Sequence, residues 1–479
     1  MKSVKIKAVL CESSFARFVF VSLFFLTAGN AVCGTYYIDC VNGKDANNGT
    51  SMSSPWLHHP YMVGWSGSYT HVAGDQFIFK GGVVCPVSYL PLTLGAGGAS
   101  GNVDFYGANT NWYTGSSWTR PIFDGGSTGP AGNMFNGGSY NYWTVDSIEF
   151  RNQMTGANYR YAVYGTGTGL TANNLYIHGW SLGTTCASGD DDKQGGVYFA
   201  GGGSTNTLSN STIDGTGTGP VGGAYQGPIA FGNTFGNIPN GIINATATAY
   251  NNTIYNIVAS CDTTQHENAI ETLSNSTTSL IYNNLIYNVS VGVVIDVCGN
   301  TTMYNNIIYN NTPYDIQIDT NCGSDSSANA VLYNNTLQST GGLVRVINRG
   351  STLGSLTLNN NHYITDASGD PACYNNTGGG CSNVTTVVDD YGMADTVTMT
   401  NSVATAQGYV PSNNYAPTTA NGGTVKVALD LTTACTNSSI GSALCTAMLG
   451  VPRPVASSWN AGAYQFAPNP PTSLSAAAH

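Results

Sequence analysis

A short motif rich in tyrosine and asparagine recurs along the chain, and it constrains the fold more than any other feature. Its clearest copies read Tyr-Asn-Asn, any residue, Ile-Tyr-Asn; all copies, weaker ones included, lie at residues 172–177, 250–256, 282–288, 304–310, 333–337 and 358–361. From Asn252 onwards, the second Asn of successive copies is spaced by 32, 22, 29 and 25 residues. Such a period, with insertions of variable length, is typical of a solenoid of stacked repeats.

The residues between the Asn pairs favour short β-strands. Each repeat alternates β-branched or aromatic residues with polar ones and is broken by Gly, Asn, Asp and Thr, without a useful helical period. The leucine lattice of leucine-rich repeats is missing. We therefore predict an all-β, single-stranded parallel β-helix whose coils stack about 4.8 Å apart. Asn at a coil corner would adopt a left-handed backbone and bond to the equivalent Asn one coil along.

The N-terminus has the order of a secretory signal. Basic residues precede the largely apolar run 18–26, and small residues follow it. We expect residues 1–34 to be a signal peptide, with cleavage after Ala31 or Gly34, and the mature protein to be extracellular or periplasmic. The apolar run is too short to cross about 30 Å of hydrocarbon, so no membrane span is expected after cleavage.

Export changes the interpretation of the cysteines. Of the 12 in the chain, Cys11 and Cys33 lie in the predicted signal, and the remaining even set suits disulfides in an oxidising compartment. The absence of a Cys-x-x-Cys pair favours disulfides over zinc. Spacing does not fix connectivity, but the plausible pairs are Cys373–Cys381, Cys435–Cys445, Cys298–Cys322, Cys40–Cys85 and Cys186–Cys261.

Charge is scarce and mostly negative. The chain has 14 Lys and Arg against 25 Asp and Glu, a formal net charge of -11, and only 8% charged residues. So few cations would not hold a phosphate backbone, which excludes nucleic acid as a partner. A groove for a polyuronate should also be more basic, so a largely neutral polysaccharide or cell-surface glycan is the expected partner. The neutral, Asn/Thr-rich flank leaves self-association open as well.

Both ends of the chain carry motifs of a known group. These are Tyr-Tyr-Ile-Asp and the Gly- and Asn-rich turn after it, the Ala-Gly-Asp strand, and the closing Arg-Pro and Asn-Ala-Gly-Ala-Tyr-Gln, at residues 36–39, 43–50, 73–82, 453–454 and 460–465. They resemble secreted right-handed parallel β-helix proteins of the pectate-lyase-like superfamily. The resemblance implies a β-helix of roughly 10–13 coils over residues 35–467, with an irregular N-terminal cap, a C-terminal capping segment and a Pro-rich tail at 468–479.

The resemblance specifies the fold more closely than the reaction. Relatives of this fold include pectate and alginate lyases, polygalacturonases, other glycoside hydrolases, phage tailspikes and surface proteins. The polygalacturonase motif series is not reproduced in this chain, so no catalytic residue is carried over from that family. Two acids of the closing signature are amides here, Asn460 and Gln465.

Carboxylates cluster at one place in this charge-poor sequence. After the predicted signal the chain has three glutamates, and two of them, Glu267 and Glu271, follow His266 closely. Aligned on the repeat, Glu271, Asp296 and Asp319 each follow an isoleucine at a strand end. Strand alternation would then turn these acids outward, as a column on consecutive coils.

The next coil offers two continuations of this column. One register adds Asn348, and the other places Arg345 beside the acids. A separate acidic loop contains Asp190 and Asp192, and we assign these two residues and Arg345 to substrate binding, with a solvated loop as the alternative for the aspartates.

Stacked acids suit glycosidic chemistry. Carboxyl groups about 5 Å apart raise one another's pKa, which keeps one of them protonated as a general acid. Neighbouring coils match the separation of retaining glycosidases, and Glu271 and Asp319, about 9.5 Å apart on alternate coils, approach that of inverting enzymes. The alternative is a lyase that binds Ca²⁺ at Asp296 and Asp319, with His266 or Arg345 as the base.

Three functions follow as hypotheses. The first is a secreted carbohydrate-active enzyme with Glu267, Glu271, Asp296, Asp319 and His266 as its catalytic set. The second is a non-catalytic surface, adhesion or glycan-binding β-helix, in which no open groove lies above the column. The third is a structural subunit of an extracellular assembly.

Overall fold

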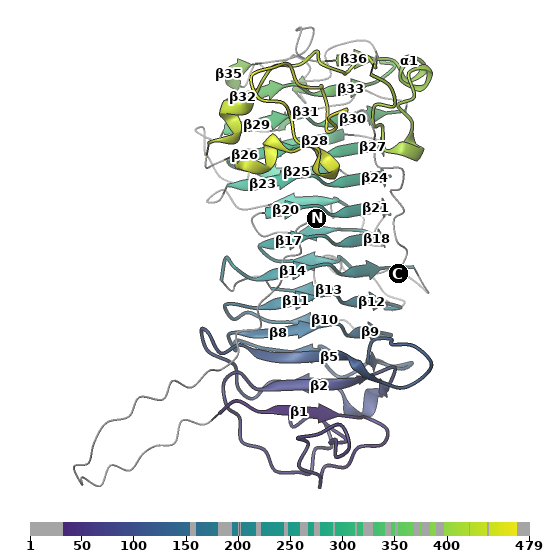
Figure 1. The fold of residues 1–479 in the computed structure, drawn as a ribbon, viewed down its shortest axis with the longest axis vertical. Helices are drawn as coiled ribbons and strands as arrows, with labels where there is room; N and C mark the ends of the chain where they lie inside the picture. The colour runs from purple at the N-terminus through teal and green to yellow at the C-terminus, as the bar shows by residue number, and fades with distance from the viewer. Residues whose placement is uncertain are drawn as a thin grey trace, which may run out of the picture.

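Three long parallel sheets wind around one axis, so the chain forms a parallel β-helix (Figure 1). The computed structural model describes residues 32–153, 160–180, 194–199, 201, 203–216, 222–243, 248–258, 267–272, 278–290, 293–311, 314–319, 329–340, 346–349, 353–367, 374–375, 384–388, 397–420, 422–437 and 440–466. Within these residues the sheets, here called A, B and C, have 13, 12 and 11 strands.

The strands are short, and each coil visits the sheets in the order A, B, C. Sheet A contains β1 (Thr35–Ile38), β2 (Gln76–Gly81), β5 (Asp104–Tyr113), β8 (Trp143–Asp146), β11 (Thr171–Asn173), β14 (Thr207–Ser209), β17 (Ile229–Phe231), β20 (Thr248–Tyr250), β23 (Ser279–Tyr282), β26 (Thr301–Tyr304), β29 (Asn329–Tyr333), β32 (Leu353–Asn359) and β35 (Val384–Val388). Sheet B contains β3 (Val84–Cys85), β6 (Ile122–Asp124), β9 (Glu149–Arg151), β12 (Tyr176–His178), β15 (Thr212–Asp214), β18 (Thr234–Ile238), β21 (Thr253–Ile257), β24 (Leu285–Val289), β27 (Ile307–Asn311), β30 (Thr336–Ser339), β33 (His362–Ile364) and β36 (Val397–Met399). Sheet C contains β4 (Leu92–Thr93), β7 (Phe135–Asn136), β10 (Arg160–Tyr164), β13 (Gln194–Tyr198), β16 (Tyr225–Gln226), β19 (Ile242–Ile243), β22 (Ile270–Thr272), β25 (Val293–Cys298), β28 (Tyr314–Asp319), β31 (Val346–Arg349) and β34 (Tyr374–Asn375).

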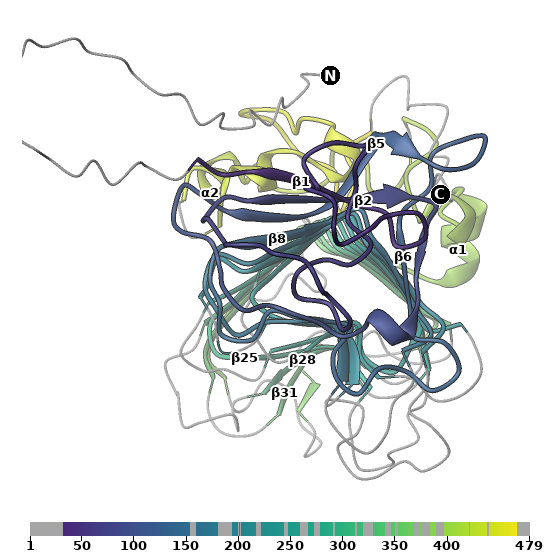
Figure 2. The ribbon, with the colours of Figure 1, turned by 90° about the horizontal axis from the view of Figure 1, so that it is seen from below.

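The predicted parallel β-helix is therefore confirmed, and the 13 strands of sheet A fall within the predicted number of coils. Figure 2, seen along the axis, shows the three sheets enclosing a common interior. Equivalent inward residues stack there, as Ile254, Ile286 and Ile308 do in consecutive strands of sheet B, each fully buried. The apolar side chains of each coil are therefore buried against those of the neighbouring coils, rather than against a separate layer of helices or sheet.

The two Asn of each motif have different tasks at the corner between sheets A and B. The first, such as Asn251, Asn283 or Asn305, has a positive φ of 56° and makes the turn, because Asn tolerates the left-handed region. The second forms a buried ladder, in which the amide N and Nδ2 of Asn252 donate to Asn284 Oδ1 at 3.1 and 3.0 Å. The sequence prediction gave both tasks to one Asn.

The ladder continues for six asparagines, Asn233, Asn252, Asn284, Asn306, Asn335 and Asn361. The last step runs from Asn335 to Asn361, 26 residues on, rather than to Asn360, the residue that the repeat alignment placed 25 residues on. The weak final copy has three consecutive Asn, and its ladder residue is the third, since Asn360 takes the left-handed turn with φ 61°.

The segment after β36 folds back over the A–B corner (yellow in Figure 1). It contains short helices, α1 (Asn401–Ala406), η2 (Pro411–Asn413), α2 (Thr432–Cys435), η3 (Ser442–Cys445) and η4 (Met448–Gly450); η1 (Val87–Tyr89) lies near the N-terminus. The Nδ2 groups of the turn residues Asn305, Asn334 and Asn360 each donate at 2.9 Å to a backbone carbonyl of this segment. The turn asparagines therefore also anchor the C-terminal segment.

Two of the predicted disulfides are confirmed, Cys40–Cys85 and Cys435–Cys445. Cys298 is itself disulfide-bonded, while its predicted partner Cys322 lies outside the described residues. The other predicted pairs, Cys373–Cys381 and Cys186–Cys261, also lie outside them. No helix in the described part of the chain is long and apolar enough to cross a membrane.

Burial of His362 should make folding sensitive to mild acid. Its side chain is 1% exposed, and desolvation lowers its pKa from 6.5 to about 3. Between these values the unfolded chain binds a proton that the folded chain does not, so stability falls as pH decreases from 6.5, by up to about 1.4 kcal/mol per pH unit. Urea unfolding at pH 6.5 and 4.5 should show a smaller loss for His362→Phe than for the wild type. An equal loss in both proteins would contradict this assignment.

Candidate functional site

The outward face of sheet C carries two of the predicted acids on neighbouring coils. In β22, Ile270 packs in the core, and Glu271 therefore points to the outer face. In β25, Ile295 and Val297 pack in the core on either side of Asp296. Glu271 and Asp296 are direct partners in the parallel ladder, as the sequence predicted.

The third acid does not continue this column. The partner of Asp296 is Gln317, and Gln317 Nε2 donates to Asp296 Oδ2 at 3.0 Å. Asp319 lies two residues further along β28, opposite Cys298, so the predicted register of Asp319 was wrong. The sequence of β28 has an apolar–polar pair at both Ile316–Gln317 and Ile318–Asp319, and either could match Ile295–Asp296.

Inward packing explains which register forms. With Ile316 opposite Ile295 and Ile318 opposite Val297, β25 and β28 pair along almost their full length. The register that puts Asp319 beside Asp296 would shift β28 by two residues and leave the end of β25 without a partner. The next coil places Ile347 opposite Gln317, so the predicted continuation of the column through Asn348 is also wrong.

Towards the N-terminus the same face carries aromatic and amide side chains. Tyr164, Tyr198 and Gln226 are partners in consecutive strands, and Ile243 follows Gln226. The rings of Tyr164 and Tyr198 stack with centroids 5.1 Å apart. Both rings are partly exposed, so this part of sheet C offers aromatic and hydrogen-bonding groups to a ligand.

The acids themselves are well covered. Glu271 is 8% exposed and Asp296 is 2% exposed, although both lie on the outer face. Glu267, just before β22, is 9% exposed, and its neighbour Asn268 donates from its backbone N to Asn240 Oδ1 at 2.8 Å. The structure therefore brings Glu271, Asp296 and Gln317 into one short, largely buried stretch of sheet C, and Glu267 lies just before it in the chain.

The remaining predicted site residues fall wholly or partly outside the part of the chain that the structure describes. His266, Asp190, Asp192 and Arg345 lie outside the described residues, and Asp319 is described only through its backbone. Within the described part of the chain, no three His, Cys, Asp or Glu side chains gather closely enough to hold a metal ion. The Ca²⁺ ligands predicted at Asp296 and Asp319 stay a prediction.

A second charged group, on the outer face of sheet B, was missed by the sequence reasoning. Asp124, Arg151, His178 and Asp214 are partners in consecutive strands. Arg151 Nη2 lies 2.8 Å from Asp124 Oδ2, and His178 Nε2 lies 3.1 Å from Glu149 Oε1. Each of the four follows an inward apolar residue at a strand end, which is the same pattern that identified Glu271 and Asp296.

This sheet B ladder is electrically compensated. Partial burial would raise the pKa of Asp124, but hydrogen bonds from Asn152, Gly126 and Arg151, together with the Arg151 charge, lower it overall. His178 also stacks on Tyr176 with ring centroids 4.2 Å apart. The acids at the two ends of this ladder, Asp124 and Asp214, lie beside Arg151 and His178 rather than beside each other, so like charges do not stack directly.

No protein-family model and no curated protein matches this sequence. Among solved structures, the GH136 lacto-N-biosidase from Eubacterium ramulus is similar over 77% of this chain and 68% of that one, with 14% identity and a TM-score of 0.50. Pectate lyase Pel9A (15% identity, 91% and 97% coverage, TM-score 0.47) and a rhamnogalacturonan lyase (14%, 76% and 89%, 0.43) are also similar. At 14% identity the likeness to the lacto-N-biosidase shows the fold alone, in agreement with the resemblance in the sequence.

Proposed function

We propose that this protein is a secreted carbohydrate-active enzyme that hydrolyses a largely neutral extracellular glycan with Glu271 and Asp296 as its acid pair. The observation that carries the proposal is the direct pairing of these two carboxylates on neighbouring coils of a chain with so few charges. Solved structures similar in fold are named for enzymes that act on carbohydrates. The two disulfides fit the secretion expected from the N-terminal sequence.

The geometry suits a retaining hydrolysis. Adjacent strands lie about 4.8 Å apart, close to the carboxyl separation of retaining glycosidases. One carboxylic acid would protonate the glycosidic oxygen as the C–O bond breaks, while the other carboxylate bonds to the sugar carbon; water then releases the sugar. Gln317 would hold Asp296 in place through its 3.0 Å hydrogen bond. Glu267 lies near enough in sequence to assist, and the Tyr164–Tyr198 stack offers rings to a sugar.

The burial of the acids supports a second candidate function. Exposed fractions of 8% and 2% are low for an open groove. They favour either an enclosed site that takes a chain end or a non-catalytic glycan-binding β-helix, in which the carboxylate–amide ladder stabilises the coils. A Ca²⁺-assisted lyase with Asp296 and Asp319 as ligands and His266 or Arg345 as base is the third arrangement.

Product analysis separates these candidates. The mature chain, incubated with a panel of neutral and acidic polysaccharides and oligosaccharides, should release new reducing ends from a neutral glycan. Unsaturated products that depend on added Ca²⁺ would indicate the lyase. Glycan binding without any product would support the non-catalytic β-helix and contradict the proposed hydrolase.

A further inference from the structure

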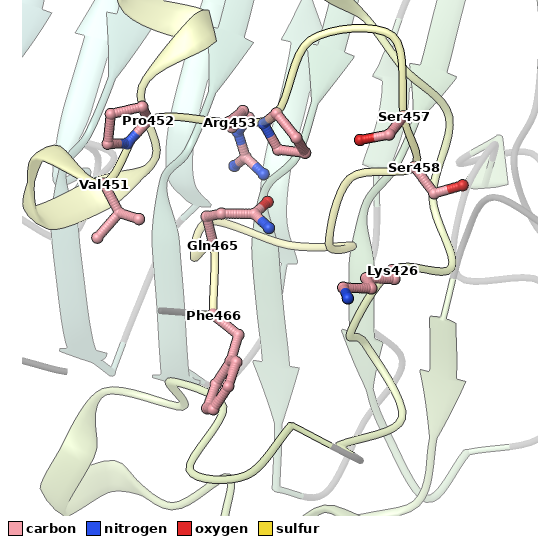
Figure 3. A pocket seen from close by; sticks show the side chains of 9 residues that line it. Lys426, Val451, Pro452, Arg453, Ser457, Ser458, Gln465 and Phe466 are labelled. Atoms are coloured by element: carbon pink, nitrogen blue, oxygen red, sulfur yellow. The ribbon is translucent and has the colours of Figure 1, made fainter. Parts of the chain in front are cut away.

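The C-terminal segment forms a pocket of about 770 Å³ that no step of the proposed hydrolysis uses. Figure 3 shows the side chains around it, among them Arg453, Lys426, Ser457, Ser458, Gln465 and Phe466. The part of this segment that is yellow in Figure 2 lies on the side of the helix opposite β25, β28 and β31. The pocket is therefore remote from the acids of sheet C.

Arg453 is the unusual residue of this pocket. Its side chain is 4% exposed, and its guanidinium donates to Asn305 Oδ1 at 2.7 Å and to the backbone oxygens of Gly462 and Asn460 at 3.1 and 3.3 Å. All of these acceptors are neutral. Its Nε is buried and has no hydrogen-bond partner among the described residues.

A buried guanidinium normally has a carboxylate beside it, because an unpaired buried charge is costly. Among the described residues, Arg453 forms no ion pair, and Trp459 supplies only a ring contact, 5.1 Å from the guanidinium carbon to the ring centroid. Burial lowers the pKa of Arg453 to about 9, so the group still carries its charge at neutral pH.

Two amides, Asn460 and Gln465, occupy positions where an acid could balance the charge of Arg453. The side chains of these amides bond to each other instead. Gln465 Nε2 donates to Asn460 Oδ1, and Asn460 N donates to Gln465 Oε1, both at 3.2 Å. The Nδ2 of Asn460 is buried without a partner in the described part of the chain. The pocket therefore has a buried cation, an exposed Lys426 and, among the described residues that line it, no acid.

We propose that this pocket binds the carboxylate of a sugar acid, with the negative charge held between Arg453 and Lys426. The serine hydroxyls and the Gln465 amide supply hydrogen bonds for the hydroxyl groups of such a ligand, and the Phe466 ring supplies a face for its C–H groups. A guanidinium is the side chain best suited to a carboxylate. The site is independent of the proposed hydrolase, and each can fail without the other.

Calorimetry with glucuronate and glucose tests the proposal, since the two sugars differ mainly in the carboxylate. The wild-type chain should bind glucuronate, and its melting temperature should be higher in the presence of glucuronate. The affinity for glucuronate should fall as the salt concentration increases. Glucose should have no effect. Absence of glucuronate binding would overturn the proposal. Equal protection by sulfate and glucuronate would overturn the sugar-acid assignment in favour of a general oxyanion site.

Two variants test which residues bind glucuronate while Arg453 itself is left unchanged. Asn460→Asp keeps the oxygen that accepts from Gln465 and removes the unpaired Nδ2. It also gives Arg453 an internal counter-charge. Glucuronate affinity should therefore fall at least about tenfold, with no loss of melting temperature. Lys426→Met should also weaken glucuronate binding, and Lys44→Met, the same charge change on the exposed N-terminal cap, should not. Undiminished affinity in both Asn460→Asp and Lys426→Met would place the ligand elsewhere.

Discussion

Replacing Asn284 with alanine is expected to lower the free energy of unfolding by about 4 kcal/mol. Asn284 is fully buried in the middle of the ladder, and its Oδ1 accepts from both the backbone N and Nδ2 of Asn252. Its own Nδ2 donates to Ala249 O at 2.9 Å and to Asn306 Oδ1 at 3.0 Å. Alanine would remove these bonds and leave several buried polar groups without their partners.

The adjacent asparagine provides the matched control. Asn283 makes the turn with φ 56°, a conformation that glycine adopts without strain. Asn283→Gly should therefore cost less than about 1 kcal/mol. Urea unfolding of both variants and the wild type measures the difference. A similar small cost for Asn284→Ala would show that the ladder contributes little to stability and that inward apolar stacking carries the fold.

The sequence was sufficient to predict that Asn284 is a structural residue, because its spacing repeats with the coil. It was not sufficient to separate Asn283 from Asn284. Both tasks suit the same amide side chain, and only the backbone path decides which Asn turns inward. In the last copy a third Asn adds another register, which is why Asn361 rather than Asn360 belongs to the ladder.

The same limit applies to the acids of sheet C. The pair Glu271 and Asp296 follows from the alignment of the repeats together with strand alternation, and the structure has it. Asp319 was misplaced because β28 repeats its apolar–polar pattern at a spacing of two residues, so local sequence allows two registers. The choice between them depends on which inward side chains of β25 meet those of β28, and that is a contact between coils.

No local pattern in the sequence predicts the pocket at Arg453. Its floor depends on a hydrogen bond between Arg453 and Asn305, which are 148 residues apart. The sequence shows that two acids of a familiar closing signature are amides, at Asn460 and Gln465. Only the structure shows that these amides bond to each other and that the guanidinium has no counter-charge among the described residues.

Glu271→Gln and Asp296→Asn are each expected to lower the turnover of the proposed hydrolase by about 10³-fold while the protein stays folded. Each amide preserves the size of the side chain but can neither donate a carboxylic acid proton nor bear the negative charge that the proposed reaction needs. The strands that hold both residues are fixed by their inward neighbours Ile270, Ile295 and Val297, so the β-helix should survive these changes. The measurement is the rate of reducing-end release at substrate saturation, with circular dichroism and melting temperature as folding checks.

Glu149→Gln is the matched control for the acid pair, because it makes the same chemical change on sheet B, where Glu149 lies beside His178 and Arg151. Its turnover should stay within about twofold of the wild type.

Gln317→Leu extends the test, since it removes the 3.0 Å hydrogen bond to Asp296 without removing either acid. If Asp296 acts in the chemistry, Gln317→Leu should lower turnover by about tenfold and shift the pH profile. Full activity in Glu271→Gln and Asp296→Asn would instead mean that the two carboxylates only support the coils, and the reaction would then require another site.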